Sequence, residues 1–128
     1  MSDITQSNSE RVAILGASDH PDRYAHKAFR MLREHGHSPI PVNPKLDQIE
    51  GVPVVAELRE IEGSVDTLTL YVNPGISEPM AEEIVELKPG RVIFNPGTES
   101  ATLAARLRAA GISYLEACTL VLLSTGQF

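Results

Sequence analysis

Four short stretches could hold a ligand, because each places small or amide side chains where an apolar run ends. They are Gly16-Ala17-Ser18, Asn43-Pro44, Asn73-Pro74 and Asn95-Pro96-Gly97. An asparagine amide offers both a donor and an acceptor, and the proline after it restricts the local backbone. Turn formation explains a single Asn-Pro step, since both residues favour turns. Three such steps, each after a predicted strand, favour a polar binding site, which would also include Val72.

The stretch around Gly16 has the features of a phosphate-binding loop. Gly16 allows a tight turn, and the small side chains of Ala17 and Ser18 let a ligand approach the main chain. A helix predicted to start around Asp22 or Arg23 would present free backbone N–H groups and the positive end of its dipole. Together with the Ser18 hydroxyl, these groups suit a pyrophosphate. The alternative is an ordinary turn with a capping side chain.

The charges near this turn are positive although the whole chain is acidic. Its 11 Lys and Arg against 17 Asp and Glu give a net charge of −6. Residues 11–45 instead carry six Lys and Arg against three Asp and Glu, a net charge of +3. Several of these cations belong to the exposed face of the first helix. Arg23 stands at the predicted start of the first helix and Lys45 follows the second predicted strand, and we expect both to contact phosphate groups.

The spacing of the turn differs from that of a dinucleotide site. Such sites carry G-x-G-x-x-G/A and an acidic residue after the second strand, which binds the ribose hydroxyls. Here Ser18 and Pro21 replace the later glycines, and Lys45 stands where an acidic residue is expected. A lysine there favours a ligand with an additional phosphate, such as NADP or coenzyme A (CoA). An NAD(P)-dependent enzyme or a nucleotide-dependent redox sensor is the alternative to a CoA-binding protein.

Short β-branched runs alternate with helical stripes along the chain. Strands are predicted at 12–15, 40–42, 67–72, 91–94 and 112–115, with a further short one at 54–55. Helices are predicted between them from apolar residues at helical spacing within 25–32, 80–87 and 103–110. This alternation indicates an α/β fold, a doubly wound, Rossmann-like parallel sheet of about five to six strands with helices on both faces. Ligands bind such sheets at the carboxyl ends of the strands, where the four stretches lie.

Length and composition indicate one domain and exclude several classes of partner. The 128 residues fit a single domain, expected over 11–128 after a polar N-terminal tail over 1–10. The acidic balance argues against nucleic-acid or membrane-surface binding, and no apolar run reaches the roughly 18 residues of a membrane span. The tail lacks the basic and apolar regions of a signal peptide, and one cysteine cannot form an internal disulfide, so we expect a cytoplasmic protein. The four histidines have no metal-ligand spacing, so no metal site is expected.

Several motifs together resemble the small stand-alone CoA-binding protein family. They are Val12-Ala-Ile-Leu-Gly-Ala-Ser18 with Pro21 and Arg23, Gly36-His-Ser-Pro-Ile-Pro-Val-Asn-Pro-Lys45, Ile49-Glu-Gly51 and Val65-Asp66. This family is similar to the CoA-binding domain of the succinyl-CoA synthetase α subunit and of ADP-forming acyl-CoA synthetases. The resemblance covers about residues 11–120. It implies a Rossmann-like fold that binds CoA or an acyl-CoA, with no established catalytic activity for the stand-alone members.

The resemblance also implies roles for individual residues. Gly16-Ala17-Ser18 matches the turn that holds the CoA pyrophosphate, and Arg23 matches a basic residue at the start of the first helix. Asn43-Pro44-Lys45 matches the segment beside the adenosine and its phosphate. Val72-Asn73-Pro74 matches the edge that lines the nucleotide crevice. Many members have Gln-x-Gly where this chain has Asn95-Pro96-Gly97, so the contacts of Asn95 and Gly97 with pantetheine stay open.

Cys118, just after the last predicted strand, is the remaining candidate. CoA ends in a thiol, so a mixed disulfide with Cys118 is chemically available. The alternative is a buried, inert side chain. The synthetase relatives use a phosphorylated histidine from another domain, which nothing here matches, so we expect a non-catalytic binding module or sensor. The apolar run 120–123 could cover the sheet or form the seam of a homodimer, and an unidentified protein partner is a further alternative.

Overall fold

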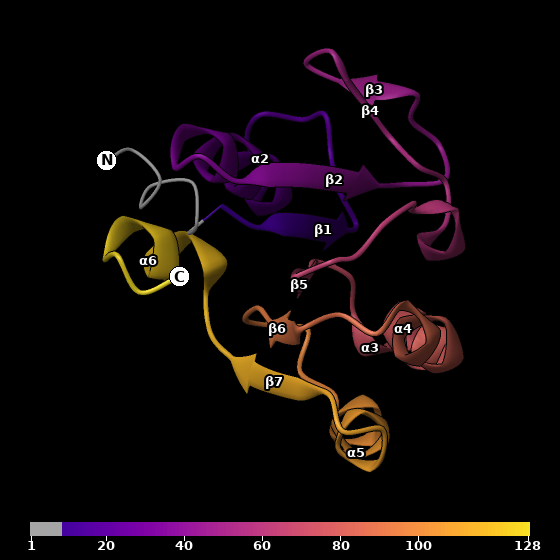
Figure 1. Cartoon of the computed structure of the whole chain (residues 1–128). Coiled ribbons are helices and arrows are strands. Elements are labelled where there is room, and N and C mark those ends of the chain that lie inside the picture. Colours follow the sequence, from indigo (N-terminus) through magenta and orange to yellow (C-terminus); the bar gives the residue numbers. More distant parts are fainter. Residues whose placement is uncertain (1–8) are drawn as a thin grey trace.

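The computed structural model of the chain describes residues 9–128, in which strands and helices alternate (Figure 1). The strands are β1 (Arg11–Leu15), β2 (Ser38–Val42), β3 (Gln48–Ile49), β4 (Val52–Pro53), β5 (Thr67–Leu70), β6 (Arg91–Phe94) and β7 (Ser113–Glu116). The α-helices are α2 (Tyr24–Glu34), α3 (Pro74–Ser77), α4 (Ala81–Leu87), α5 (Ala101–Ala109) and α6 (Thr119–Ser124). Short 3-10 turns occur at η1 (Leu58–Glu60) and η2 (Glu78–Met80).

Within the described residues, five strands form one parallel sheet in the order β2-β1-β5-β6-β7. The chain runs outward from β1 to β2 and then crosses to β5, on the other side of β1. This reversal is the switch point of a doubly wound sheet, where ligands bind beyond the carboxyl ends of the strands. The register aligns these ends, since Leu15 lies opposite Val42 in β2 and Leu70 in β5. The predicted Rossmann-like α/β fold is confirmed.

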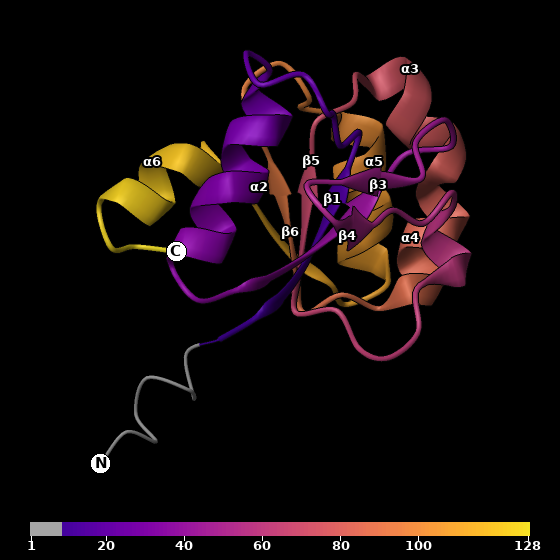
Figure 2. The same cartoon turned by 90° about the horizontal axis from the view of Figure 1, so that it is seen from above.

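Helices cover both faces of the sheet (Figure 2). On one face, Phe29 of α2 and Leu123 of α6 share a core cluster with Ile14 of β1. On the other face, Leu107 of α5 shares a core cluster with Leu15. Alternate residues of β1 therefore point into separate cores, which explains why this strand is apolar without interruption.

β3 and β4 form a short antiparallel hairpin, and the predicted strand at 54–55 is reduced to a single bridge between Val55 and Val42. Glu50 and Gly51 make the two-residue turn of the hairpin, with φ values of +50° and +84°. Val55 N–H donates to the carbonyl oxygen of Pro41 at 3.0 Å. The hairpin is thereby attached to the edge strand β2.

The helical segment predicted over 80–87 begins earlier and is divided into α3, η2 and α4. Pro79 lies at this division and lacks an N–H group, so it cannot continue the regular hydrogen-bond pattern. The C-terminal segment, for which the sequence predicts no definite element, contains α6. No helix within residues 9–128 is long and apolar enough to cross a membrane.

The predicted N-terminal tail lies outside the described residues over 1–8, whereas Ser9 and Glu10 contact the domain. The Ser9 hydroxyl donates to the carbonyl oxygen of Gly36 at 2.8 Å. Glu10 N–H donates to His37 Nδ1 at 3.0 Å. Burial lowers the pKa of His37, so its neutral ring can accept this bond. The domain boundary at residue 11 stays a prediction, and these bonds hold Ser9 and Glu10 at the amino-terminal edge of the sheet.

Candidate functional site

A cleft of about 580 Å³ opens beyond the carboxyl ends of β1 and β5, at the switch point of the sheet. Its size lies within the roughly 300–1,000 Å³ of small-molecule sites. The predicted site residues that line it are Gly16, Ala17, Ser18, Arg23, Asn43, Lys45, Val72, Asn73 and Gly97. Four sheet loops and the first turn of α2 thus bring together residues that are up to about 80 positions apart in the sequence.

The loop after β1 divides its backbone N–H groups between the fold and the cleft. Gly16 N–H and Ala17 N–H both donate to the carbonyl oxygen of Val42, at 3.2 Å each. Ser18 N–H and Asp19 N–H form no hydrogen bond within residues 9–128. The Ser18 hydroxyl oxygen accepts from His20 N–H at 3.0 Å, which leaves the hydroxyl hydrogen free to donate. The donors available to an anion therefore begin at Ser18.

The amino terminus of α2 adds further donors to this part of the cleft. The helix begins at Tyr24 and its N-cap residue is Arg23, whose side chain makes no capping hydrogen bond. The first N–H groups of any α-helix have no partner within the helix, and Tyr24 and Ala25 line the cleft. The first turn holds no acidic residue to neutralise the positive end of the dipole. This end of α2 therefore favours an anion.

Arg23 and Lys45 supply two cationic side chains at the cleft, and both are exposed. Neither forms an ion pair with another residue of the described part of the chain. Asp19 is the acidic residue of the lining, and its carboxylate lies 3.8 Å from His20 Nε2. The predicted cations are thus free to bind an anionic ligand.

The three Asn-Pro steps have different roles in the structure. Asn43 Nδ2 donates to the Ala17 carbonyl oxygen at 2.8 Å and Asn43 Oδ1 accepts from Lys45 N–H at 2.7 Å, so this amide shapes the cleft wall. Asn73 is exposed at the cleft and its side chain does not cap α3. Asn95 is only 2% exposed and lies outside the cleft lining.

The amide of Asn95 is fully used inside the fold. Its Nδ2 donates to Thr69 Oγ1 at 2.7 Å and to the Leu70 carbonyl oxygen at 2.8 Å. Its Oδ1 accepts from Thr119 N–H at 2.9 Å. These bonds join β6 to the end of β5 and to the start of α6. The geometry therefore supports a structural role for Asn95 beneath the cleft, rather than the expected contact with a ligand.

Three other predicted residues lie outside the cleft lining. Pro44 and Pro74 follow Asn43 and Asn73 in the loops, and neither contributes to the lining. Cys118 is half-buried at the N-cap of α6 and is also not part of the lining. A mixed disulfide with CoA at Cys118 stays an untested prediction.

The cleft also contains two tyrosines that sequence reasoning missed. Tyr24 is 68% exposed at the start of α2, an unusual position for a large aromatic side chain. Tyr71 follows β5, and its hydroxyl is buried without a hydrogen-bond partner in the described part of the chain. Burial raises the pKa of Tyr71 to about 12, so this phenol stays protonated at neutral pH. The sequence does not indicate that Tyr24 is exposed at the cleft, because this residue does not belong to the apolar stripe from which the helix is predicted.

No group of three or more His, Cys, Asp or Glu side chains that could hold a metal ion occurs in residues 9–128. The donors at the cleft are instead N–H, hydroxyl, guanidinium and ammonium groups, which bind anions. The arrangement can therefore hold a phosphorylated small molecule through the protein's own groups.

Comparisons with known proteins agree with this chemistry. A family model described as CoA binding domain matches residues 10–124. Uncharacterized protein YneT of Bacillus subtilis (strain 168) is 37% identical over 78 residues, which cover 61% of this chain and 58% of that protein. Acetate–CoA ligase (ADP-forming) II subunit alpha of Pyrococcus furiosus is 32% identical over 66 residues, which cover 51% of this chain and 14% of that subunit. The chain thus spans less than two thirds of the length of these relatives.

Solved structures share the fold over nearly the whole chain. Cell-free ID.343 from Thermus thermophilus has a TM-score of 0.87 and 30% sequence identity, covering 98% of this chain and 96% of that one. An uncharacterized protein has a TM-score of 0.87 and 45% identity, covering 94% and 98% of the two chains. Because the family model matches residues 10–124 and the same fold recurs in these structures, the chain belongs to the CoA binding domain family.

Proposed function

We propose that this protein binds CoA, or an acyl-CoA, in the cleft at the switch point and acts as a non-catalytic binding module or sensor. The observation that carries the proposal is the set of unused donors on one side of the cleft. Ser18 N–H, Asp19 N–H and the first turn of α2 lie there together with the unpaired side chains of Arg23 and Lys45. CoA is polyanionic, with a pyrophosphate and a 3′-phosphate, so it needs such donors at more than one point.

The residues present are suited to the parts of CoA that carry charge. A pyrophosphate would be held by the N–H groups of Ser18 and Asp19, by the amino terminus of α2 and by Arg23. Lys45, in the loop after β2, would bind the 3′-phosphate. No acidic residue of this loop lines the cleft to bind ribose hydroxyls, which disfavours NAD. Lys45 would also suit the additional phosphate of NADP, so the preference for CoA over NADP rests on the match to the CoA binding domain family.

The side chains of the cleft support binding rather than catalysis. A nucleophile or general base would need a partner within hydrogen-bond reach and a pKa near the working pH. Tyr71 stays protonated because its pKa is about 12. Asp19 and His20 are exposed and lie 3.8 Å apart, too far for a hydrogen bond that would orient the imidazole. The Ser18 hydroxyl contacts a backbone N–H and no base.

Titration of ¹⁵N-labelled protein with CoA, followed by amide chemical shifts, tests where the ligand binds. The largest shifts are expected at Asp19 and Tyr24, whose N–H groups would face the pyrophosphate. Asp66, at the amino-terminal edge of the sheet, is expected to keep its shift. Saturable shifts confined to that opposite edge would contradict the proposed cleft.

Replacing Lys45 by glutamine is expected to weaken CoA binding about tenfold, because one charge-assisted contact with the 3′-phosphate is lost. Binding of dephospho-CoA, which lacks that phosphate, should weaken less than about twofold in the same variant. Calorimetric titration of both ligands gives the two ratios. Lys88→Gln removes the same charge at the C-terminal end of α4 and serves as the control. Equal losses for CoA and dephospho-CoA in Lys45→Gln would mean that Lys45 does not bind the 3′-phosphate.

A further inference from the structure

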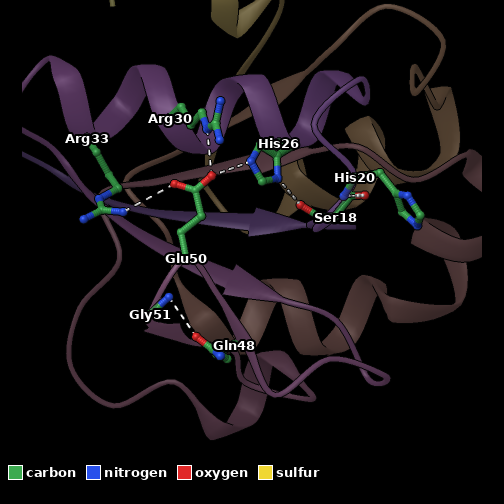
Figure 3. A network of polar contacts seen from close by, with 8 residues as sticks. All are labelled: Ser18, His20, His26, Arg30, Arg33, Gln48, Glu50 and Gly51. Carbon is green, nitrogen blue, oxygen red and sulfur yellow. Dashed lines mark hydrogen bonds and ion pairs between the residues drawn. The ribbon is translucent and has the colours of Figure 1, made fainter.

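His26 of α2 connects the loop after β1 to the β3–β4 hairpin. Its side chain is only 3% exposed, and both ring nitrogens have partners (Figure 3). Nδ1 lies 2.9 Å from the carbonyl oxygen of Ser18, and Nε2 lies 2.8 Å from Glu50 Oε2. His26 lies outside the cleft lining, so any effect on a ligand must pass through Ser18.

These two partners fix the orientation of the ring. A carbonyl oxygen only accepts hydrogen bonds, so Nδ1 must carry a hydrogen. The Glu50 carboxylate is ionised, since hydrogen bonds from Arg30 and then from His26 lower its pKa. Arg30 Nε lies 2.7 Å from the same carboxylate oxygen, and Arg33 lies 3.9 Å from the other. Both ring nitrogens therefore face acceptors, and the ring is held from two sides.

The bond to Ser18 sets the direction of a cleft donor. The peptide between Ser18 and Asp19 is trans and planar, so its C=O and N–H groups point in opposite directions. His26 holds the Ser18 carbonyl toward the buried side of α2. Asp19 N–H consequently points away from His26, and it is one of the N–H groups without a partner in residues 9–128.

The hairpin holds Glu50 in a backbone conformation that glutamate rarely adopts. Its φ of +50° belongs to the left-handed region, where residues other than Gly, Asn and Asp are uncommon. An outlier of this kind persists when surrounding contacts require it and is a reason to look for a function. Here the required contacts are those of the carboxylate with His26 and Arg30.

We propose that His26 and Glu50 are positioning residues for the anion-binding loop, and that their contacts hold the Ser18–Asp19 peptide in the orientation that binds a phosphorylated ligand. This rests on the proposed function. Without the Glu50 carboxylate, Nε2 of the ring would lose its partner, and without the ring the Ser18 carbonyl would lose its donor. Either change would release the Ser18–Asp19 peptide from its fixed orientation.

The charged groups around the His26 ring come from three elements. Glu50 belongs to the hairpin, and Arg30 and Arg33 belong to α2 itself. Asp19 and His20 of the loop after β1 are exposed and form no hydrogen bond or ion pair with the ring within residues 9–128. His20 also lines the cleft, so the variants are compared in a His20→Gln background at one fixed pH.

Dephospho-CoA is the probe, because its only phosphates are those of the pyrophosphate that the loop after β1 would hold. In the His20→Gln background, Glu50→Ala is expected to weaken its binding about tenfold, because the partner of His26 Nε2 is removed. Glu50→Gln should bind within about threefold of the parent, because its side-chain amide can still form a hydrogen bond with the ring while Nδ1–H stays on Ser18. His26→Asn places an amide donor near the Nδ1 position and should bind within about threefold of the parent, whereas His26→Gln should bind about tenfold more weakly. His35→Gln, at the exposed C-terminal end of α2, is the control.

The outcomes separate this inference from the proposed function. A protein that does not bind CoA at all overturns both. A protein that binds CoA, but whose affinity is unchanged by Glu50→Ala and whose His26 variants are equal to His35→Gln, overturns the positioning role alone. A measurement without any variant guards against misfolding: the ¹⁵N shifts of the His26 imidazole should show a hydrogen on Nδ1, the nitrogen that faces the Ser18 carbonyl. A ring without a hydrogen on Nδ1 would also overturn the positioning role.

Discussion

Replacing Gly16 by alanine is expected to lower the free energy of unfolding by about 4 kcal/mol, through two separate effects. Gly16 has a φ of +91°, a conformation that costs an L-residue about 1–2 kcal/mol. A Cβ at this position would also lie 2.8 Å from the carbonyl oxygen of Tyr71 and 2.8 Å from Val72 Cγ1. Overpacking of this kind costs about 1–3 kcal/mol, and the backbone oxygen cannot move without disturbing β5. The same displacement would shift the loop that carries Ser18.

Gly36→Ala is the matched control for this experiment. Gly36 has a φ of +85°, and a Cβ there would meet nothing within 4 Å. Replacing Gly36 by alanine should lower the free energy of unfolding by about 1–2 kcal/mol, the strain of an L-residue with a positive φ. Urea denaturation of both variants isolates the contact with Tyr71 as the difference. If both variants lose the same free energy of unfolding, a Cβ at position 16 does not clash with Tyr71 and Val72.

The second large effect is expected for Asn95→Leu, which should lose about 3 kcal/mol of stability. Leucine has the same branched outline, with two methyl groups in place of the amide oxygen and nitrogen, but it cannot make the three hydrogen bonds to Thr69, Leu70 and Thr119. Each bond contributes about 1 kcal/mol on balance, and the buried groups at Leu70 and Thr119 would be left without a partner. Denaturant unfolding measures the loss directly.

The comparison of Asn95 with Asn73 separates structure from binding. Asn73→Leu, at an exposed position, should change stability by less than about 0.5 kcal/mol. The folded Asn95→Leu protein should still bind CoA within about threefold of the original. An Asn95→Leu protein of normal stability that no longer binds CoA would instead support the contact with the ligand that the sequence predicts.

The sequence carries most of the information about the fold. Apolar runs such as 12–15 alternate with helical stripes, and parallel strands connected by helices place all their carboxyl ends at one edge. This suffices to predict the cleft and to assign Gly16, Ser18, Arg23 and Lys45 to it. The hairpin at 48–53 was not predicted, because Glu50 occupies a turn position that normally selects glycine or asparagine.

The roles of individual polar side chains required the structure. Asn43, Asn73 and Asn95 look equivalent in the sequence, since each precedes a proline at a strand end. Only the tertiary contacts distinguish an amide that supports the cleft wall from one that is exposed and one that is buried. His26 gave no signal for a similar reason, because its partner Glu50 is 24 positions away in a hairpin that the periodicity does not reveal.

Calorimetric titration of the unmodified protein with CoA, acetyl-CoA, NADPH and NADH tests the central claim most directly. The missing ribose-binding acid disfavours NADH, and the match to the CoA binding domain family favours CoA over NADPH. We therefore expect CoA or acetyl-CoA to bind at least about tenfold more tightly than either nicotinamide nucleotide. Binding of NADPH or NADH in preference to both CoA compounds would contradict the account.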